Sequence, residues 1–515
     1  MSLSSGKRKA FFSLFDQENA VSYAKQLVAL GWEIIASSET FSLLKEHNVP
    51  VKNISDFLEV RKSYPFPPTL HPSLELFLTT DQGDTVDFVY ITNYPLSEGN
   101  DVGGHTILAL AAKGKRIVVF NKEDMERVIK ELQNSNNEIP DSLRQELINK
   151  AFTKIAKHYQ SLLPDSKNMQ GSKIIIGEKA MTLLEGENPY QVPCELFKTD
   201  DSDAMALPNF EQLCGELPCY TNMADFDSIL QTLCLAAEAF CKYYQKVPYI
   251  VVAAKHGNPC GLAIDWEEPR LAVKNALLGN PSAIFGGEVI TNFSINEKIA
   301  ELLVFSVERE KLLGSPKWSL DLIIASDFDQ TAIEILKSQK RLKIFKNNAL
   351  TRPRLSKLNW SYRMVRGGFL RQPPNNYVLN FEEIDLEVSS AVSDSIDSLI
   401  IAWATAWSSA HGGNEVALAK NRMLLAAGGG PATIDSCRIA INRAKNCRHS
   451  LEGSVFASNA FFPFSDASEE LVKAGCSYGI VPKGGRNFES VKNYFKEQNV
   501  KVFYLPKQFR GFCRH

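Results

Sequence analysis

The chain has 515 residues, of which 57 are basic and 59 acidic, so its net charge is −2 with histidine neutral. A chain this close to neutrality has no overall basic field to attract nucleic acid or an anionic membrane. Apolar residues make up 44% of it, enough for buried cores, and no apolar run approaches the roughly 18 residues that a membrane-spanning helix needs. The first residues also lack the apolar centre of a secretory signal. We therefore expect a cytoplasmic protein of roughly two to four domains that binds neither nucleic acid nor membranes.

The ten cysteines and eight histidines are scattered along the chain. No C-x-x-C pair and no H-E-x-x-H motif occurs, and even the nearest cysteines, Cys214 and Cys219, are too far apart for a zinc knuckle. Cys260 follows His256 and a proline in a way that resembles zinc deaminases, but Ala263 stands where those enzymes need a second cysteine. The sequence therefore predicts free thiols and no metal, in particular no zinc.

Strands and helices alternate in the first part of the chain. The expected elements are strands at residues 10–14, 33–36, 87–92 and 116–121 and helices at 20–28 and 41–46. This alternation predicts a parallel α/β layer with helices on both faces of its sheet. A polar helical stretch from 122 to 162 leads into a polar linker up to residue 172. We place the main boundary at 165, which gives domains of residues 1–165 and 166–515.

The second part of the chain also has an α/β pattern. The expected elements are strands at residues 249–254, 321–325, 457–464, 479–481 and 502–505 and helices at 330–338 and 396–407. The three consecutive glycines at 428–430 predict a turn. No internal repeat is evident in the sequence.

The strongest chemical signal from the residues alone is the pair Lys255 and His256. An apolar strand at 249–254 ends at this pair, and the glycines and proline that follow are typical of a loop. Active sites of α/β folds gather at the carboxyl ends of strands. Histidine can remove a proton from an attacking amine near neutral pH, and lysine can stabilise negative charge on oxygen. The alternative is an exposed loop pair without a chemical role, and the spacing alone leaves both open.

Many short strings, in order along nearly the whole chain, resemble those of the bifunctional AICAR transformylase/IMP cyclohydrolase family. Residues 255–261 match K-H-x-N-P-C-G, and residues 186–191 match G-E-N-P-H-Q except at Tyr190. Further similar strings lie at residues 69–72, 94–95, 101–106, 111–113, 282–287, 365–372, 419–421, 457–464 and 510–515.

This resemblance implies a fold and a reaction. The fold would be a parallel α/β cyclohydrolase domain, similar to methylglyoxal synthase, followed by a transformylase domain of two cytidine-deaminase-like α/β halves. The protein would be a homodimer with active sites at the subunit interface. Its co-substrate would be 10-formyltetrahydrofolate, which supplies a formyl group to a small-molecule amine. A bound monovalent cation is also compatible with the family.

The resemblance also assigns roles to individual residues. His256 would be the base for the amine proton, Lys255 would assist transfer and stabilise charge, and Asn421 would orient the formyl group. The implied substrate-binding and folate-binding residues are Phe285, Gly286, Gly287, Asn188, Asn459, Phe461 and Arg510. The implied remnant of the cyclohydrolase site is Tyr94, Asp101 and Lys113.

The first domain departs from the family where a nucleotide phosphate would bind. The family loop S-D-K-T-G has become residues 13–19, without lysine, threonine or glycine, and the family T-G-G-T has become residues 37–40. The family R-V-K has become residues 66–68, Phe-Pro-Pro. Phosphate sites need a cation and bare backbone N–H groups, so carboxylates such as Asp16 and Glu39 would repel the ligand. We therefore predict that cyclohydrolase activity is lost.

The acceptor side of the second domain departs as well. In the family string L-R-Y-G, an arginine–tyrosine pair helps to hold the AICAR phosphate, and this chain has Leu184 and Glu185 there. The change removes a cation and adds an anion. The family K-S-N is residues 412–414, Gly-Gly-Asn, and the aspartate of A-S-D-A is Asn459. Because the folate side is largely kept, the sequence predicts a 10-formyltetrahydrofolate-dependent N-formyltransferase whose acceptor is not AICAR.

Two alternatives stay open at this point. The first is an ordinary AICAR formyltransferase of purine biosynthesis that holds the phosphate with other basic residues, such as Lys483 or Arg486. The second is a catalytically inactive paralogue that binds folate or dimerises with a true enzyme. The degenerate loops of the first domain favour the inactive paralogue, whereas the presence of Lys255, His256 and Asn421 opposes it.

Overall fold

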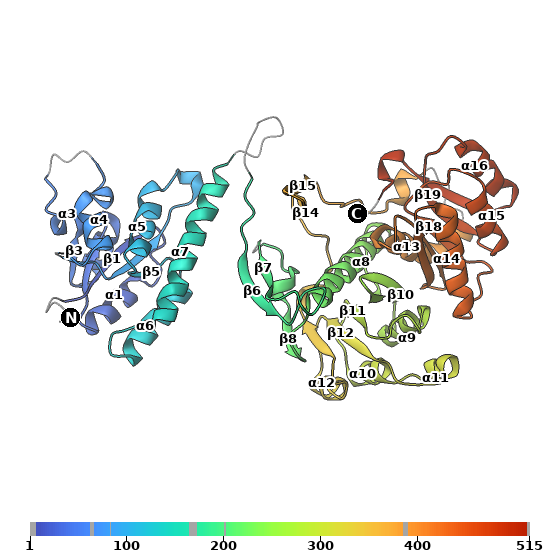
Figure 1. Ribbon diagram of the computed structural model, residues 1–515, viewed down its shortest axis with the longest axis horizontal. Coiled ribbons are helices and arrows are strands. Elements are labelled where there is room, and N and C mark those ends of the chain that lie inside the picture. The colour runs from blue at the N-terminus through green and yellow to red at the C-terminus, as the bar shows by residue number, and fades with distance from the viewer. Residues whose placement is uncertain are drawn as a thin grey trace. The chain divides into compact units, whose positions relative to one another are not determined.

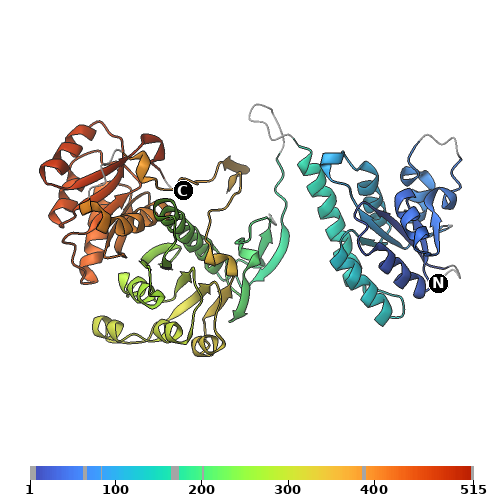
Figure 2. The same ribbon diagram turned by 180° about the vertical axis from the view of Figure 1, so that it is seen from behind.

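The computed structural model describes residues 7–61, 66–82, 84–163, 173–199, 202–384 and 390–511 (Figures 1 and 2). The chain divides into two compact units, Met1–Glu178 and Lys179–His515. The boundary predicted at residue 165 lies outside the described residues. None of the helices in the described ranges combines the length and the apolar character that crossing a membrane requires.

The first unit contains a five-stranded sheet in the order β3-β2-β1-β4-β5, with every neighbouring pair parallel. The four strands predicted from apolar runs are confirmed, and β3 is an additional short edge strand. The strands are β1 Lys9–Leu14, β2 Glu33–Ala36, β3 Val51–Asn53, β4 Phe88–Thr92 and β5 Ile117–Val119. The helices are α1 Ala20–Ala29, α2 Ser38–Glu46, α3 Ile54–Phe57, α4 Pro72–Thr79, α5 Val102–Lys113, α6 Lys122–Asn134 and α7 Asp141–Ser161.

Helices cover both faces of this sheet, as the alternation predicted. Phe12 of β1 packs with α1, α2 and α6 on one face, and Phe11 packs with α3, α4 and α5 on the other. The helical stretch predicted at 122–162 is two helices instead of one. Asn136 and Asn137 both have positive φ, and Pro140 follows them, so the chain reverses between α6 and α7.

The second unit is built on an eleven-stranded sheet in the order β20-β19-β18-β16-β17-β10-β9-β11-β12-β13-β8. The elements of its first half are β8 Glu211–Cys214, α8 Tyr220–Tyr244, β9 Tyr249–Lys255, β10 Asn258–Asp265, α9 Pro269–Gly279, β11 Gly287–Thr291, α10 Glu297–Val304, α11 Val307–Leu313, β12 Leu320–Ala325, α12 Gln330–Leu336 and β13 Lys343–Lys346. Those of its second half are α13 Ser390–Ser408, β16 Asn414–Lys420, β17 Met423–Gly430, α14 Thr433–Asn446, β18 Val455–Ser458, α15 Asp466–Lys473, β19 Tyr478–Pro482, α16 Phe488–Glu497 and β20 Lys501–Leu505.

The two halves repeat one order of elements, which the sequence did not reveal. Leaving the edge strand β8 and the short α11 aside, each half runs helix, β-hairpin, helix, strand, helix, strand, helix, strand. Outward from the middle of the sheet, β10-β9-β11-β12-β13 matches β17-β16-β18-β19-β20. The halves meet where Ala263 of β10 pairs with Met423 of β17 in the antiparallel sense. The unit therefore has an approximate internal twofold relation.

The layers of this unit follow the repeat. Helices α8 and α13 pack on each other and cover one face of the sheet. Helices α9, α10 and α12 cover the other face of the first half, and α14, α15 and α16 cover that face of the second half (Figure 1). Two small two-stranded sheets are separate from it, β6 Glu178–Leu183 with β7 Cys194–Lys198 and the antiparallel pair β14 Ser361–Val365 with β15 Gly368–Gln372.

Three predicted features of the second unit are wrong in detail. The loop expected after Lys255 is only two residues long, because β10 begins at Asn258. The strand expected at 457–464 is β18, which ends at Ser458. The glycines at 428–430 end β17 instead of forming a turn. A Cβ on Gly428 would lie 2.5 Å from the carbonyl oxygen of Ser436 on α14, so this glycine serves close packing of helix on strand.

Candidate functional site

A two-residue turn presents Lys255 and His256 where the central strands β9 and β10 of the large sheet meet. Between β9 and β10 only His256 and Gly257 form the turn, with φ of 54° and 66°. Positive φ at both residues is the geometry of a type I′ hairpin. A Cβ on Gly257 would lie 2.8 Å from the hydroxyl oxygen of Ser228, so the turn packs directly against α8. The exposed imidazole of His256 is therefore carried on a rigid support.

The loop before β11 contacts Lys255. The amine Nζ donates a hydrogen bond to the carbonyl oxygen of Gly286, whose φ is positive at 63°. Phe285, 67% exposed, precedes this glycine. A Cβ on Gly287 would collide with the carbonyl oxygen of Ala254, so only glycine lets the loop approach β9 so closely. The structure thus brings Lys255 together with the predicted Phe285, Gly286 and Gly287.

Carboxylates lie behind Lys255, and the sequence analysis missed them. Glu288 on β11 is 2% exposed, and burial and then the nearby Asp225 hold its pKa well above the ordinary value, against the opposite effect of Lys255. Its Oε2 has no hydrogen-bond partner among the residues that the structure describes. The carboxylate of Asp321 lies on the other side of Gly286 from β9. The one sequence signal was a glutamate inside an otherwise apolar strand.

A cavity of about 250 Å³ opens beside the turn. Its lining includes Lys255, His256, Cys260, His411 and Arg443. Burial raises the pKa of the Cys260 thiol to about 12, so at neutral pH this cysteine stays a thiol and is a poor nucleophile. The chemically active groups of the cavity are therefore the two imidazoles and the two cations.

His411 is a site residue that the sequence analysis did not identify. It lies between α13 and β16, and its Nδ1 is 2.7 Å from Oε2 of Glu415. The side chain of Glu415 is 1% exposed, so a buried carboxylate holds this imidazole. The two residues are separated by a glycine pair in the sequence, and no motif marks them as partners.

The structure does not bring Asn421 to the same site within one chain. Asn421 and Arg422 form the turn between β16 and β17, with φ of 51° and 63°, so this turn is the counterpart of the His256 turn in the other half. The backbone of Arg422 bonds to Ile264 near the far end of β10. Ile264 is six residues along the strand from Asn258, which is roughly 20 Å. Within one chain the structure therefore brings Lys255 and His256 together, while the twofold relation puts Asn421 at the opposite end of these strands. The catalytic role of Asn421 stays a prediction.

Asn459 is in the neighbourhood of the site, but its side chain is engaged in the fold. It is 1% exposed, its Oδ1 accepts the backbone N–H of Glu415 at 2.8 Å, and its Nδ2 donates to the carbonyl of Gly413. Asn292 makes the same pair of bonds in the other half, to Ile250 and Pro248. Both amide atoms of Asn459 thus bind backbone groups of the fold, and its ligand-binding role stays a prediction.

Phe461 and Arg510 lie together next to Asn459. The guanidinium carbon of Arg510 is 5.7 Å from the centre of the Phe461 ring, and Gly511 donates its N–H to the carbonyl of Asn459. A Cβ on Gly484 would lie 2.7 Å from the Phe461 ring, so the ring rests on backbone. The last residues of the resembling string at 510–515 lie outside the described residues.

Asn188 does not line the cavity. Its backbone N–H and its Nδ2 both bond to the side-chain oxygen of Gln191, at 2.8 and 2.9 Å, within an exposed turn. This turn follows Leu184 and Glu185, and the carbonyl of Glu185 accepts the N–H of Tyr220 at the start of α8. The departures at 184 and 185 therefore lie at the amino end of the helix whose next turns support Lys255 and His256.

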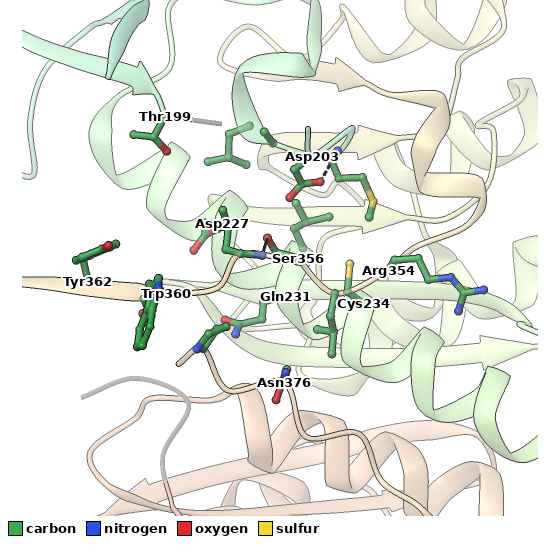
Figure 3. Close-up of a pocket in the computed structure, with 18 of the residues that line it drawn as sticks. Thr199, Asp203, Asp227, Gln231, Cys234, Arg354, Ser356, Trp360, Tyr362 and Asn376 are labelled. Carbon is green, nitrogen blue, oxygen red and sulfur yellow. Dashed lines mark hydrogen bonds between the residues drawn. The ribbon is translucent and has the colours of Figure 1, made fainter. Parts of the chain in front are cut away.

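A larger cavity of about 580 Å³ lies on another side of α8 (Figure 3). Asp227 and Gln231 of α8 line it opposite Trp360 and Tyr362, while Arg354 extends away from this group. Arg354 instead pairs with Glu238 at 3.2 Å. None of the site residues predicted from the sequence lines this cavity.

The predicted cyclohydrolase remnant in the first unit is only partly a cluster. Asp101 caps α5, accepting the N–H of Gly104 and the Nδ2 of Asn93, each at 2.8 Å. The hydroxyl of Tyr94 donates to the carbonyl of Asn100. Lys113 is at the other end of α5, about 17 Å along the helix. The structure therefore brings Tyr94 near Asp101 and does not bring Lys113 to them within one chain.

The two loops of the first unit that resemble the family's phosphate loops carry acidic side chains. The carboxylates of Asp16 and Glu18 both pair with Lys122, the latter as a hydrogen bond. Glu39 lies exposed in the first turn of α2, where the helix dipole would otherwise favour a bound anion. In the described part of the chain no group of three or more histidine, cysteine or acidic side chains is arranged to hold a metal ion.

Comparison with known proteins gives one consistent family. The model of the AICARFT/IMPCHase bienzyme family matches residues 111–443. The chain is similar to the bifunctional purine biosynthesis protein PurH of Caldicellulosiruptor saccharolyticus, with 29% identity over 98% of this chain and 99% of the relative. It is 28% identical to the PurH protein of Persephonella marina, over 96% of this chain and 98% of the relative. Among solved structures, ForH is 25% identical, covers 30% of this chain and 96% of its own, and has a TM-score of 0.28.

Proposed function

Because the chain belongs to the AICARFT/IMPCHase bienzyme family and is a formyltransferase, we propose that it transfers the formyl group of 10-formyltetrahydrofolate to an amine other than AICAR. The observation that carries this proposal is the presence of Lys255 and His256 at the mouth of a cavity whose acceptor-side surroundings have changed. We further propose that the cyclohydrolase reaction has been lost.

The reaction would proceed by attack of the amine nitrogen on the formyl carbon. A nitrogen–carbon bond forms, the bond between the formyl carbon and N10 of the folate breaks, and the amine proton ends on N10. His256 would take the proton from the attacking amine, and the ammonium of Lys255 would stabilise the negative charge that develops on the formyl oxygen. The hydrogen bond to Gly286 holds Lys255 in place for this role.

Changed charge on the acceptor side supports a changed acceptor. Leu184 is exposed where the family has an arginine, and Glu185 adds an anion beside it. An arginine–phosphate pair contributes about 1.5–3 kcal/mol, so its loss would weaken AICAR binding by roughly tenfold or more. The buried Glu288 and Glu415 also place two carboxyl groups near the cavity.

The acidic loops of the first unit support the loss of cyclohydrolase activity. Lys122 is already shared by Asp16 and Glu18, so it would bring no net positive charge to an incoming phosphate. We propose that this unit, with its all-parallel sheet, corresponds to the methylglyoxal-synthase-like cyclohydrolase domain. We propose that the second unit corresponds to the transformylase domain with two cytidine-deaminase-like halves, which its internal repeat supports.

A homodimer is part of the same proposal. The hairpin of β14 and β15 exposes the apolar side chains of Met364 and Leu370, which a partner subunit would cover. Analytical ultracentrifugation of the wild type should give twice the mass of the chain, and replacing both side chains by lysine should shift the protein toward the monomer.

The test is folate turnover by the purified full-length protein. Tetrahydrofolate release would be followed with 10-formyltetrahydrofolate and AICAR, with AICA riboside, which lacks the phosphate, and with a panel of other primary amines. Release with another amine but slow release with AICAR is expected. Rapid release with AICAR and accumulation of formylated AICAR would instead establish the ordinary transformylase, with Lys483 or Arg486 as its candidate phosphate contact.

The cyclohydrolase proposal has its own readout. Adding formylated AICAR directly should give no IMP, because the loops carry carboxylates where phosphate would bind. Formation of IMP would contradict this part of the proposal without affecting the transferase part. The family match favours either enzyme over the inactive paralogue.

A further inference from the structure

The cavity beside Lys255 contains a second imidazole that is held more firmly than the first. Both oxygens of the Glu415 carboxylate bind one residue, since Oε1 accepts the backbone N–H of His411 at 2.6 Å and Oε2 lies 2.7 Å from its Nδ1. A carboxylate accepts hydrogen bonds, so Nδ1 carries the hydrogen and the lone pair of the neutral ring is on Nε2. His411 is 16% exposed and lines the cavity, which makes Nε2 the nitrogen available to a ligand.

The surrounding backbone is adapted to keep the carboxylate of Glu415 in place. A Cβ on Gly429 of β17 would collide with both oxygens of this carboxylate, so only glycine leaves room for it. Asn459, the residue after β18, accepts the backbone N–H of Glu415 from the other side. The bond from Asn459 has a counterpart in Asn292 of the other half, so the feature particular to this site is the space that Gly429 leaves for the carboxylate.

One side chain connects the backbones that carry the two imidazoles. The Oδ1 of Asn258 accepts the N–H of Ala410, the residue before His411, at 2.8 Å. Its Nδ2 donates to the carbonyl of His256 at 3.0 Å. The backbones at His256 and His411 are therefore tied together, and both residues line the same cavity although they are far apart in the sequence.

We propose that His411, oriented by Glu415, binds the acceptor of formyl transfer through Nε2. The acceptor class is a primary amine that carries a second N–H or O–H donor next to the reacting nitrogen. Nε2 accepts the hydrogen bond from that second donor and so orients the amine toward His256 and the formyl carbon. This inference rests on the proposed formyl transfer and adds the group that selects its acceptor.

The first test compares two replacements of His411. Asparagine can keep a donor near the position of Nδ1 and removes Nε2, whereas glutamine can place an amide oxygen near the position of Nε2. We expect His411→Asn to raise KM for the amine about tenfold or more, leave KM for 10-formyltetrahydrofolate unchanged and leave Tm near that of the wild type. His411→Gln should recover part of the loss. A rise in KM for the folate alone would overturn the proposal.

The second test moves the carboxylate without changing either partner. Gly429→Ala places a Cβ against Glu415 and should raise KM for the amine, as His411→Asn does. Gly430→Ala is the matched control on the same strand, because the atom nearest to its Cβ would be the Cβ of Asp435, at 3.6 Å. Equal effects of the two alanines would overturn the role of Glu415.

A binding experiment separates this inference from the proposed function. In an NMR titration, the imidazole signal of His411, identified by its loss in His411→Asn, should shift when AICAR or a productive amine is added and should not shift with tetrahydrofolate. If no amine is formylated by the wild type, the proposed function fails, and the titration still decides the binding role. A His411 signal that no amine of the panel moves would overturn the inference.

Discussion

His256 occupies a backbone conformation that few side chains adopt without cost. The equivalent turn of the second half carries Asn421 with nearly the same φ, 51° against 54°. Asparagine is among the residues that tolerate the left-handed region best. The internal repeat thus shows that the turn can be built without an imidazole, which separates the chemistry of His256 from the folding of its hairpin.

A substitution of His256 uses this separation. His256→Asn should keep Tm within about a degree or two of the wild type, because asparagine tolerates the left-handed conformation of the turn. It should lower the rate of formyl transfer about 10²–10⁴-fold, because the base is lost. His256→Ala should also lose about 1 kcal/mol of stability, because alanine pays the left-handed penalty. Turnover unchanged in His256→Asn would refute the base role of His256.

The paired asparagines give a second prediction. Removing either side chain leaves a backbone N–H and a carbonyl of a buried strand end unpaired, which costs about 1–3 kcal/mol. Asn459→Ala and Asn292→Ala should therefore lower the free energy of unfolding by similar amounts in urea. Only Asn459→Ala should change KM for the amine, because Asn459 contacts Glu415 and Asn292 lies at the opposite edge of the sheet.

Glu288 gives a pH dependence of known sign. Burial and then Asp225 raise its pKa in the folded protein above 4.5, so the folded state holds this proton more tightly than the unfolded state. The stabilisation from the retained proton is complete below pH 4.5 and is lost as the pH rises toward the folded pKa. Glu288→Gln should therefore be more stable than the wild type at neutral pH and show a weaker fall of stability with rising pH. An unchanged pH profile of unfolding would contradict a raised pKa.

At the scale of elements, close contact between helix and strand determines where glycine is required. Helix α9 crosses β10 so closely that a Cβ on Gly261 would collide with the carbonyl oxygen of Ala276. Gly428 plays the same part between β17 and α14 in the other half. These glycines looked like turn or loop residues in the sequence, because packing partners cannot be seen there.

Gly261→Ala should destabilise the protein strongly. The added Cβ would collide with the backbone of Ala276, so helix α9 must move. This movement costs at least about 1–3 kcal/mol. Gly368→Ala on β15 is the control, since no atom lies within 4 Å of its Cβ position. Thermal and urea unfolding should show a loss for the first variant and little change for the second. Equal stabilities would show that α9 is looser than its contacts indicate.

Strands and helices were predictable from the sequence where a single pattern of apolar residues runs through the whole element. The buried strands β1, β4, β9 and β12 read as short apolar runs, because both of their faces are covered by helices. The helical stretch predicted at 122–162 is helical in α6 and α7, and the break between them, where Asn136 and Asn137 have positive φ, was not predicted. Local propensity does not report such a reversal.

At the scale of the whole molecule, the two units have separate hydrophobic cores. Leu27 lies in the core of the first unit and Leu233 in that of the second, and both are fully buried. We expect two transitions in calorimetry. Leu27→Ala should lower the midpoint temperature of only one transition and Leu233→Ala that of only the other. Each shift should correspond to a loss of about 2–5 kcal/mol in the free energy of unfolding. One transition that both substitutions shift equally would show that the units unfold as one.

The sequence by itself determined the family, the alternation of elements in the first unit and the adjacency of Lys255 and His256, because each of these is carried by residues that are neighbours along the chain. Only the tertiary structure showed that Asn421 lies at the opposite end of the strands, that Asn459 binds the backbone of Glu415 and that His411, held by Glu415, lines the cavity. These facts depend on strand register and on the twofold relation of the halves. The halves meet through Ala263 and Met423, which are far apart in the chain, so no local pattern of residues shows this relation.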